Sequence, residues 1–458
     1  MSLSRALLFI VASLWLSRGQ AAGPRLFPLP EPAYARSGIN TAIFRHHALL
    51  TIGAHQLVAY FAQDGKAVLL LRSLTNGQVK RILRFDNPMP AQMLGDGHQG
   101  INLGYSADGF IHVIWGCHGT PNPPYLKLRW PDLTVVPDAP PPWTGITTEL
   151  TYPQFHGPPQ RLLLSFRRDS APGTPSEQYD HCLLQYEART GKWQPLQTPL
   201  LRYSTTRLAY LNTLGDMGNT LVTAYTIRRE DLMNRRDAAV RVMNESFHVI
   251  VSRDNGHTWS NLAGQSLAVP IAALDETSLA LRISPDQKLI NQGGGWLAQD
   301  GKYHFGYFRS DAHGVPQIYL TTVALSTGRH STVALTQRNQ SFDLPGRGSQ
   351  TWPISRPAVF GVGQTLAVAY REDDHLICQF RNRTDGTWRK AELYTGELGN
   401  YEPILDYTRL RDGSLTFYVQ SSRQGQDDTP DRSTRSALAF LLELSEPELL
   451  AWPDTHAK

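Results

Sequence analysis

The sequence is poor in cysteine, in clustered positive charge and in long apolar segments. Its three cysteines (Cys117, Cys182 and Cys378) are too few for a disulfide framework, although one pair could form and leave the third free. Lysine and arginine form no basic run, and a net charge of +4 gives little reason to expect a nucleic-acid partner. No segment is long and apolar enough to span a bilayer, so we expect no membrane association.

The first 22 residues have the pattern of a secretion signal. Arg5 supplies a positive charge before the apolar run 6–16, and small residues at 19–22 offer a cleavage site. We therefore expect residues 1–22 to be a signal peptide and residues 23–458 to form one domain, secreted or periplasmic. The sequence leaves the oligomeric state open.

Turns and aromatic residues are abundant. The chain has 37 glycines, 31 prolines, 10 tryptophans and 18 tyrosines, a composition that favours an all-β fold. Seven times a turn is followed by a strand of about six mostly apolar residues. These turns are centred near Ala54, Asp108, Pro159, Met217, Asp300, Val362 and Asp412. Four-stranded blades packed around an axis bury both faces of such strand pairs. The sequence therefore predicts an all-β, seven-bladed β-propeller.

One stretch carries a blade-turn motif. SRDNGHTW, at 252–259, fits the Asp-box pattern S-x-D-x-G-x-T-W. In this pattern Asp254 is expected to accept hydrogen bonds from nearby backbone amides, and Trp259 to pack under the loop. We interpret the motif as structural and assign no function to His257.

Two histidines lie symmetrically about one of the seven turns. His98 is ten residues before Asp108, and His118 is ten residues after it. In an unbulged hairpin the two residues face each other across the open end, with Cα atoms about 4.5–5.5 Å apart. This symmetry favours a functional site at one rim of the propeller.

The next two hairpins bring further polar residues to the same rim. Tyr152 opens one strand, and Arg167 and Arg168 close its partner. Only one of the two arginines can face inward, since successive side chains of a strand point to opposite faces. Arg168 is favoured and Arg167 is the alternate. Tyr225 and Arg228, at the end of the fourth hairpin, are expected to contact the substrate.

Two imidazoles, a phenol and a guanidinium suit β-elimination across a 4-linked uronic acid. The C5 proton leaves only if the adjacent carboxylate is neutralised, and arginine does this without titrating. A neutral histidine can take the proton near pH 7. A tyrosine hydroxyl can protonate the leaving oxygen O4, or take the C5 proton itself. The paired carboxylates of a standard glycosidase do not stand out at comparable hairpin ends.

On these motifs the sequence resembles the BNR-repeat propellers that include the ulvan lyases. The resemblance spans roughly residues 42–420 and rests on segments such as GHQGINLGYSADGFIHVIWGCHG, TYPQF followed by SFRR, and INQGGGWLAQDGKYHFGYFR. It implies a seven-bladed enzyme that cleaves a sulfated, uronate-containing polysaccharide, with its catalytic pattern on His98, His118, Tyr152 and Arg168. It also implies no catalytic cofactor. Some relatives carry a structural metal ion, whose ligands we do not place in this sequence.

The leading hypothesis is a secreted lyase that acts on a uronate-containing, ulvan-like acidic polysaccharide. One alternative is a sialidase-like or other glycoside hydrolase, because Asp boxes are common there. Against it, only one Asp box is clean, and the arginine segment typical of sialidases is reduced to 44–47 (FRHH). The other alternative is a non-catalytic glycan-binding propeller whose histidines only bind.

Overall fold

The computed structural model describes most of the chain after residue 22. The described residues are 23–43, 45–86, 89–90, 92–146, 148–169, 178–233, 243–344, 349–382, 384–425, 428–433 and 436–453. The expected signal peptide, residues 1–22, lies outside them. Among the described helices none has the length and apolar character needed to cross a membrane.

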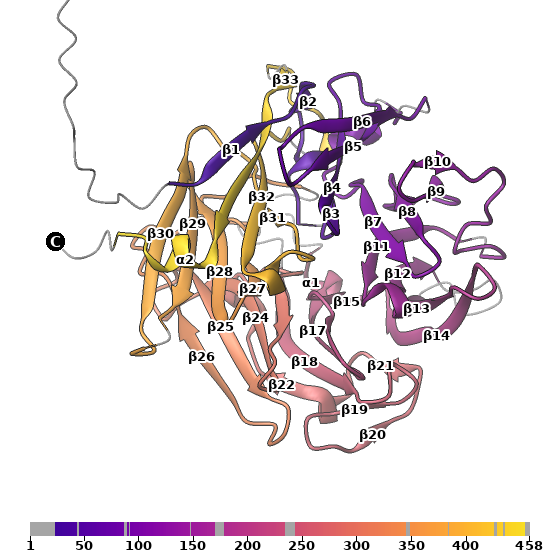
Figure 1. The fold of residues 1–458 in the computed structure, drawn as a ribbon. Helices are drawn as coiled ribbons and strands as arrows, with labels where there is room; N and C mark the ends of the chain where they lie inside the picture. The colour runs from indigo at the N-terminus through magenta and orange to yellow at the C-terminus, as the bar shows by residue number, and fades with distance from the viewer. Residues whose placement is uncertain are drawn as a thin grey trace, which may run out of the picture.

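Antiparallel sheets dominate the described residues and are arranged around a common centre (Figure 1). Seven sheets of four or more strands follow one another along the chain, which confirms the predicted seven-bladed propeller. Blade one holds β3 (Leu49–Ile52), β4 (His55–Phe61), β5 (Ala67–Ser73) and β6 (Val79–Arg84). Blade two holds β7 (Asn102–Ser106), β8 (Phe110–Ile114), β9 (Tyr125–Arg129) and β10 (Thr134–Val135).

The next two blades are the largest. Blade three holds β11 (Leu150–His156), β12 (Leu163–Asp169), β13 (Gln178–Glu187), β14 (Lys192–Ser204) and β21 (Ile271–Ala272). Blade four holds β15 (Arg207–Leu211), β16 (Gly215–Met217), β17 (Thr220–Arg229), β18 (Asn244–Ser252), β19 (Trp259–Ser260), β20 (Ser266–Leu267) and β22 (Leu279–Leu281).

Three four-stranded blades complete the ring. Blade five holds β23 (Gly295–Leu297), β24 (Lys302–Ser310), β25 (Pro316–Ala324) and β26 (His330–Ala334). Blade six holds β27 (Ala358–Val362), β28 (Thr365–Glu372), β29 (His375–Arg381) and β30 (Trp388–Thr395). Blade seven holds β31 (Ile404–Leu405), β32 (Ser414–Gln420), β34 (Ala439–Ser445) and β1 (Arg25–Pro28).

The other described elements are short. A two-stranded sheet joins β2 (Ala33–Tyr34) to β33 (Ser436–Ala437). The α-helices are α1 (Glu230–Met233) and α2 (Glu446–Leu450). The 3-10 helices are η1 (Gly38–Asn40), η2 (Met93–Gly95), η3 (Pro159–Arg161), η4 (Glu276–Ser278), η5 (Pro285–Gln287) and η6 (Leu410–Asp412).

One strand near the start of each blade lies nearest the axis. β3 contacts β7, β7 contacts β11, β16 contacts β23, and β23 contacts β27. The two ends of the chain share the last blade, because β1 pairs antiparallel with β34 and sets Arg25 opposite Glu443. Figure 1 shows this indigo strand beside the yellow strands of the last blade. The ring is therefore closed by main-chain hydrogen bonds between its first and last parts.

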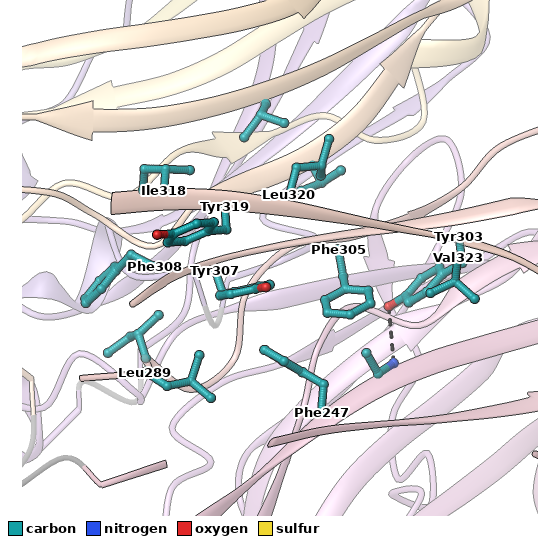
Figure 2. Packing of buried hydrophobic residues seen from close by; sticks show 14 of the residues in the cluster. Phe247, Leu289, Tyr303, Phe305, Tyr307, Phe308, Ile318, Tyr319, Leu320 and Val323 are labelled. Carbon is teal, nitrogen blue, oxygen red and sulfur yellow. Dashed lines mark hydrogen bonds between the residues drawn. The ribbon is translucent and has the colours of Figure 1, made fainter. Parts of the chain in front are cut away.

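Aromatic side chains fill the space between neighbouring blades. Figure 2 shows Phe247 of β18 packing against Phe305 and Tyr307 of β24, with ring centroids 4.8 and 4.7 Å away. Tyr303 lies on the same face of β24, because alternate residues of a strand share a face. Its hydroxyl accepts a hydrogen bond of 3.4 Å from the Ala224 amide. Each of these fully buried rings contributes about 2–3 kcal/mol of hydrophobic stabilisation.

The Asp-box motif forms the expected turn. The Asp254 carboxylate accepts hydrogen bonds from the amide (2.9 Å) and the hydroxyl (2.6 Å) of Thr258. Trp259 is 1% exposed, and its indole N–H donates to the Gly256 carbonyl at 3.1 Å. His257 is exposed, and nothing in the turn calls for a functional role.

All three cysteines are buried and free. Cys117 follows β8, Cys182 lies in β13 and Cys378 lies in β29, so the pair that the sequence allowed does not form. Burial raises the pKa of each thiol, which keeps it protonated. The three side chains therefore serve as small apolar packing groups.

Buried histidines, His112 and His304 among them, make the stability of the fold depend on pH. His112 in β8 is fully buried, with Nδ1 2.8 Å from the Tyr125 hydroxyl and Nε2 3.0 Å from the Ser106 hydroxyl. Burial, followed by the charge of Lys127, lowers its pKa to about 3. His304 in β24 has a pKa of about 4, again chiefly because of burial.

We expect acidification from pH 7 to pH 5 to destabilise the protein. Below pH 6.5 the unfolded chain binds protons at these histidines, whereas the folded chain does not. Each of them should therefore lower the free energy of unfolding by about 1.4 kcal/mol per pH unit. Urea denaturation at several pH values measures this slope, which should be smaller by that amount in His112→Gln. A flat profile in the wild-type protein between pH 7 and 5 would contradict the expectation.

Candidate active site

The β7–β8 hairpin brings two histidines together at its open end. Asn102 pairs with Ile114, so the segments that enter β7 and leave β8 lie side by side. The rings of His98 and His118 stack with centroids 4.3 Å apart and 19° between their planes. Their side chains are 12% and 27% exposed, so solvent reaches both. The rings thus face each other, as their symmetry about the turn predicts.

One carboxylate holds both imidazoles. Asp96 contacts Nδ1 of His98 through Oδ1, and its Oδ2 lies 2.5 Å from Nδ1 of His118. It also accepts a hydrogen bond of 2.9 Å from the His98 amide. An ionised carboxylate only accepts, so each Nδ1 carries a proton, and a neutral His118 ring keeps its lone pair at Nε2. Asp96 was not predicted from the sequence. The one sign of its role there is its position two residues before His98.

Burial sets the protonation of this group. The pKa of His118 is lowered by burial and by the neighbouring His98, although hydrogen bonding to Asp96 opposes the shift. Burial alone would raise the pKa of Asp96, but the two imidazoles outweigh it and hold this pKa well below the ordinary value. His118 is therefore neutral near pH 7 and able to accept a proton, while Asp96 is ionised.

Tyr152 reaches the histidines from a strained position in the next blade. Its φ of +57° lies in the left-handed region, which is rare for residues other than glycine. Its amide donates to the Cys117 carbonyl at 3.2 Å. Its ring centroid lies 5.7 Å from that of His98 and 5.5 Å from that of His118. Burial, and then Tyr210, raise the pKa of Tyr152, so the phenol stays protonated and can donate.

The strand register places Arg167, not Arg168, beside Tyr152. The Arg167 guanidinium carbon lies 4.9 Å from the centroid of the Tyr152 ring and 5.8 Å from that of Tyr210. Arg168 points to the other face, where its Nη2 lies 3.4 Å from Oδ2 of the fully buried Asp180. The arginine favoured from the sequence therefore lies away from the histidine pair, and its alternate joins it, because successive side chains of β12 alternate.

Arg167 keeps one donor unused. Its Nη1 is buried and has no hydrogen-bond partner among the described residues. A buried guanidinium N–H without a partner carries a penalty of about 1–3 kcal/mol, which an incoming acceptor relieves. A ligand carboxylate is the acceptor that fits a guanidinium best.

Of the two residues expected from the fourth hairpin, one joins the cluster. Arg228 donates from Nη1 to the Tyr210 hydroxyl at 3.3 Å, and its Nε pairs with Glu230 at 2.8 Å. Tyr225 is fully buried, and its hydroxyl lies 3.2 Å from that of Ser278. A side chain inside the core cannot touch a polysaccharide, so the substrate contact expected of Tyr225 is corrected to a packing role.

One described group has the composition and spacing of a metal site. Asp96, His98 and His118 each offer a ligand atom, and these atoms lie within 4.8 Å of one another. In the observed arrangement, however, both Nδ1 atoms are hydrogen-bonded to the carboxylate. The group is accounted for as a hydrogen-bonded triad, and we assign no metal to it.

Comparison with known proteins places the chain in a family. The sequence model of the family described as BNR repeat-containing family member matches residues 55–336, more than half of the chain. The chain belongs to this family. No curated protein matches this BNR-repeat protein in sequence.

Solved structures of ulvan lyases share its fold. A polysaccharide lyase, an ulvan lyase bound to GlcA(1-4)Rha3S, superposes with a TM-score of 0.61 and 13% identity, over 93% of this chain and 100% of that chain. A second ulvan lyase structure gives 0.60 with the same identity and coverage. An α-L-arabinanase from Penicillium chrysogenum with arabinobiose reaches 0.44 with 10% identity, over 92% and 99%. At these identities the likeness to the lyases shows the propeller fold and no more.

We expect Asp96→Asn to disturb the histidine pair in a way that NMR detects. An asparagine offers one acceptor oxygen and no charge, so it cannot hold both Nδ1–H groups. Because Asp96 raises the pKa of His118 against burial, losing the charge should lower that pKa further. Histidine-selective NMR titration measures the shift, and His112 serves as an internal control in the same blade. An unchanged His118 titration would show that Asp96 does not hold the ring.

Proposed function

We propose that this protein is a polysaccharide lyase that cleaves a uronate-containing polysaccharide by β-elimination. One observation carries the proposal: Tyr152 lies between a stacked histidine pair and the Arg167 guanidinium. These are the groups that the elimination needs, and they meet where solvent reaches. The shared fold with ulvan lyases supports the same reaction class.

In this mechanism Arg167 neutralises the uronate carboxylate. The unpaired Nη1 binds one carboxylate oxygen, and the surrounding tyrosine rings keep the charge poorly solvated, which strengthens the pairing. The negative charge that develops on the carboxylate as C5 loses its proton is then stabilised. Without a fixed positive charge the C5–H bond is too weakly acidic to break.

The histidine pair takes the C5 proton. Neutral His118 accepts it at Nε2, and the resulting imidazolium is stabilised by the ionised Asp96 at Nδ1. His98 shares the same carboxylate and holds the stack in place. Near pH 7 His118 can act as the base because burial keeps it unprotonated.

Tyr152 completes the reaction at the leaving group. Its protonated hydroxyl donates to O4 as the C4–O4 bond breaks. Afterwards the His118 imidazolium releases the C5 proton to solvent and the Tyr152 phenolate takes one up, which restores both groups. The electrons of the C5–H bond form the C4–C5 double bond. The products are a new reducing end and an unsaturated uronate at the new non-reducing end.

The substrate we propose is an acidic, ulvan-like polysaccharide. Arg228 lies next to Arg167 through their shared contact with Tyr210, but its Nε is paired with Glu230, so Arg167 supplies the positive charge for an anionic chain. Export of the protein, expected from residues 1–22, would give it access to a polymer outside the cell.

Incubation with ulvan tests the proposal. We expect ultraviolet absorbance from the unsaturated uronate to rise together with new reducing ends, and a neutral polysaccharide to give neither. Tyr152→Phe should lower the rate by roughly 100- to 10,000-fold, because the proton donor is lost. Reducing ends without absorbance would instead indicate a hydrolase, and binding without either signal a glycan-binding propeller.

The two adjacent arginines provide a matched pair of variants. Arg167→Ala should lower kcat by roughly 100- to 1,000-fold with a smaller change in KM, since the charge acts mainly in the transition state. Arg168→Ala should keep kcat near the wild-type value and lower stability, because it leaves the buried Asp180 with one cation fewer. Steady-state kinetics and thermal melting of both variants check this. The reverse result would return Arg168 to the site.

A further inference from the structure

A second cavity lies at the opposite end of the same hairpins. It has a volume of about 440 Å³ and is lined by residues of the innermost strands β3, β7, β11, β16 and β23 and of the loop before β32. The histidine pair marks the open end of the β7–β8 hairpin, whereas Tyr105, next to the turn, lines this cavity. We call it the axial pocket and define it by Tyr105, Arg161, Asp216, Trp296, Tyr407 and Arg411.

Three blades each contribute one aromatic ring to the axial pocket. Tyr105 comes from β7, Trp296 from β23 and Tyr407 from the loop between β31 and β32. All three side chains are partly exposed. Aromatic side chains that line a pocket of this size suit the C–H faces of a sugar ring, and the volume lies within the range of small-ligand sites.

An arginine–carboxylate pair faces the same space. Arg161 contacts Oδ1 of Asp216 and donates to the Gly218 carbonyl at 2.7 Å. The other oxygen of Asp216, Oδ2, is buried and has no hydrogen-bond partner among the described residues. A carboxylate oxygen in this state accepts a hydrogen bond from a ligand hydroxyl with a net gain.

Arg411 leaves the axial pocket with one unmatched positive charge. Arg161 is neutralised by Asp216, but no carboxylate in the described part of the chain pairs with Arg411, which is exposed. The histidines on the pocket floor add no charge, because burial lowers the pKa of His47 to about 4 and that of His46 well below the ordinary value. The charge pattern therefore favours an anionic ligand.

From these three features we propose that the axial pocket binds an acidic sugar. The ring packs on the aromatic side chains, a hydroxyl donates to Asp216 and the anionic group pairs with Arg411. This site is separate from the histidine pair and does not depend on the proposed elimination. The lyase assay and the binding assay below can therefore fail independently.

Calorimetric titration tests the inference. Glucuronic acid is titrated into the Arg167→Ala protein, which lacks the guanidinium at the histidine pair, so that the remaining binding reports the axial pocket. Glucose serves as the matched neutral sugar, and inorganic sulfate as the anion alone. We expect one site for glucuronic acid, with glucose at least roughly tenfold weaker and sulfate not bound measurably.

Variants in the same background locate the site. Arg411→Ala should weaken glucuronic acid binding roughly tenfold, because the positive charge that pairs with the sugar carboxylate is lost. Arg189→Ala, at a side chain that is 83% exposed between β13 and β14, is the control and should change nothing. The proposal is overturned if the Arg167→Ala protein does not bind glucuronic acid. It is equally overturned if Arg411→Ala leaves the affinity for glucuronic acid unchanged, or if sulfate binds as tightly as the sugar.

Discussion

Closure of the ring is the constraint on which the rest of the structure depends. Each blade carries apolar side chains on both faces, and only a neighbour on either side covers them. Phe247, Phe305 and Tyr307 show how one such interface is filled by rings from two blades. Once the ring is closed, the innermost strands meet at the axis and their hairpin ends are fixed at two opposite rims. Both sites described above are consequences of this arrangement.

In the proposed reaction, burial prepares both the acid and the base by a single physical effect. It disfavours the charged form of any side chain, and the charged form is the imidazolium of a histidine but the phenolate of a tyrosine. The same environment therefore keeps His118 unprotonated and Tyr152 protonated near pH 7. Asp96 remains ionised there because two imidazoles contact it. In the proposed reaction its negative charge stabilises His118 once that ring has accepted the proton.

The sequence allowed the fold and the facing histidine pair of the candidate site to be predicted, because both follow from regular strand geometry. Seven turn-and-strand repeats give seven blades, and symmetry about one turn gives the facing histidines. The errors occur at irregular backbone. Tyr152 and Pro153 together lie opposite Phe166, which makes a β-bulge that no local sequence pattern predicts. A register shift of one residue decides which of the two arginines faces inward. A similar register shift follows Tyr225, whose side chain lies in the core. Asp96 was missed because its role depends on two rings that only the folded chain brings to it.

The pairing of β1 with β34 also bears on how the chain is made. The two strands lie far apart in the chain, so a growing chain cannot finish this blade before β34 has been made. Until then β1 has no partner strand, and unpaired strand edges of this kind promote association with other chains. The order of synthesis thus makes this blade the last of the seven to be completed.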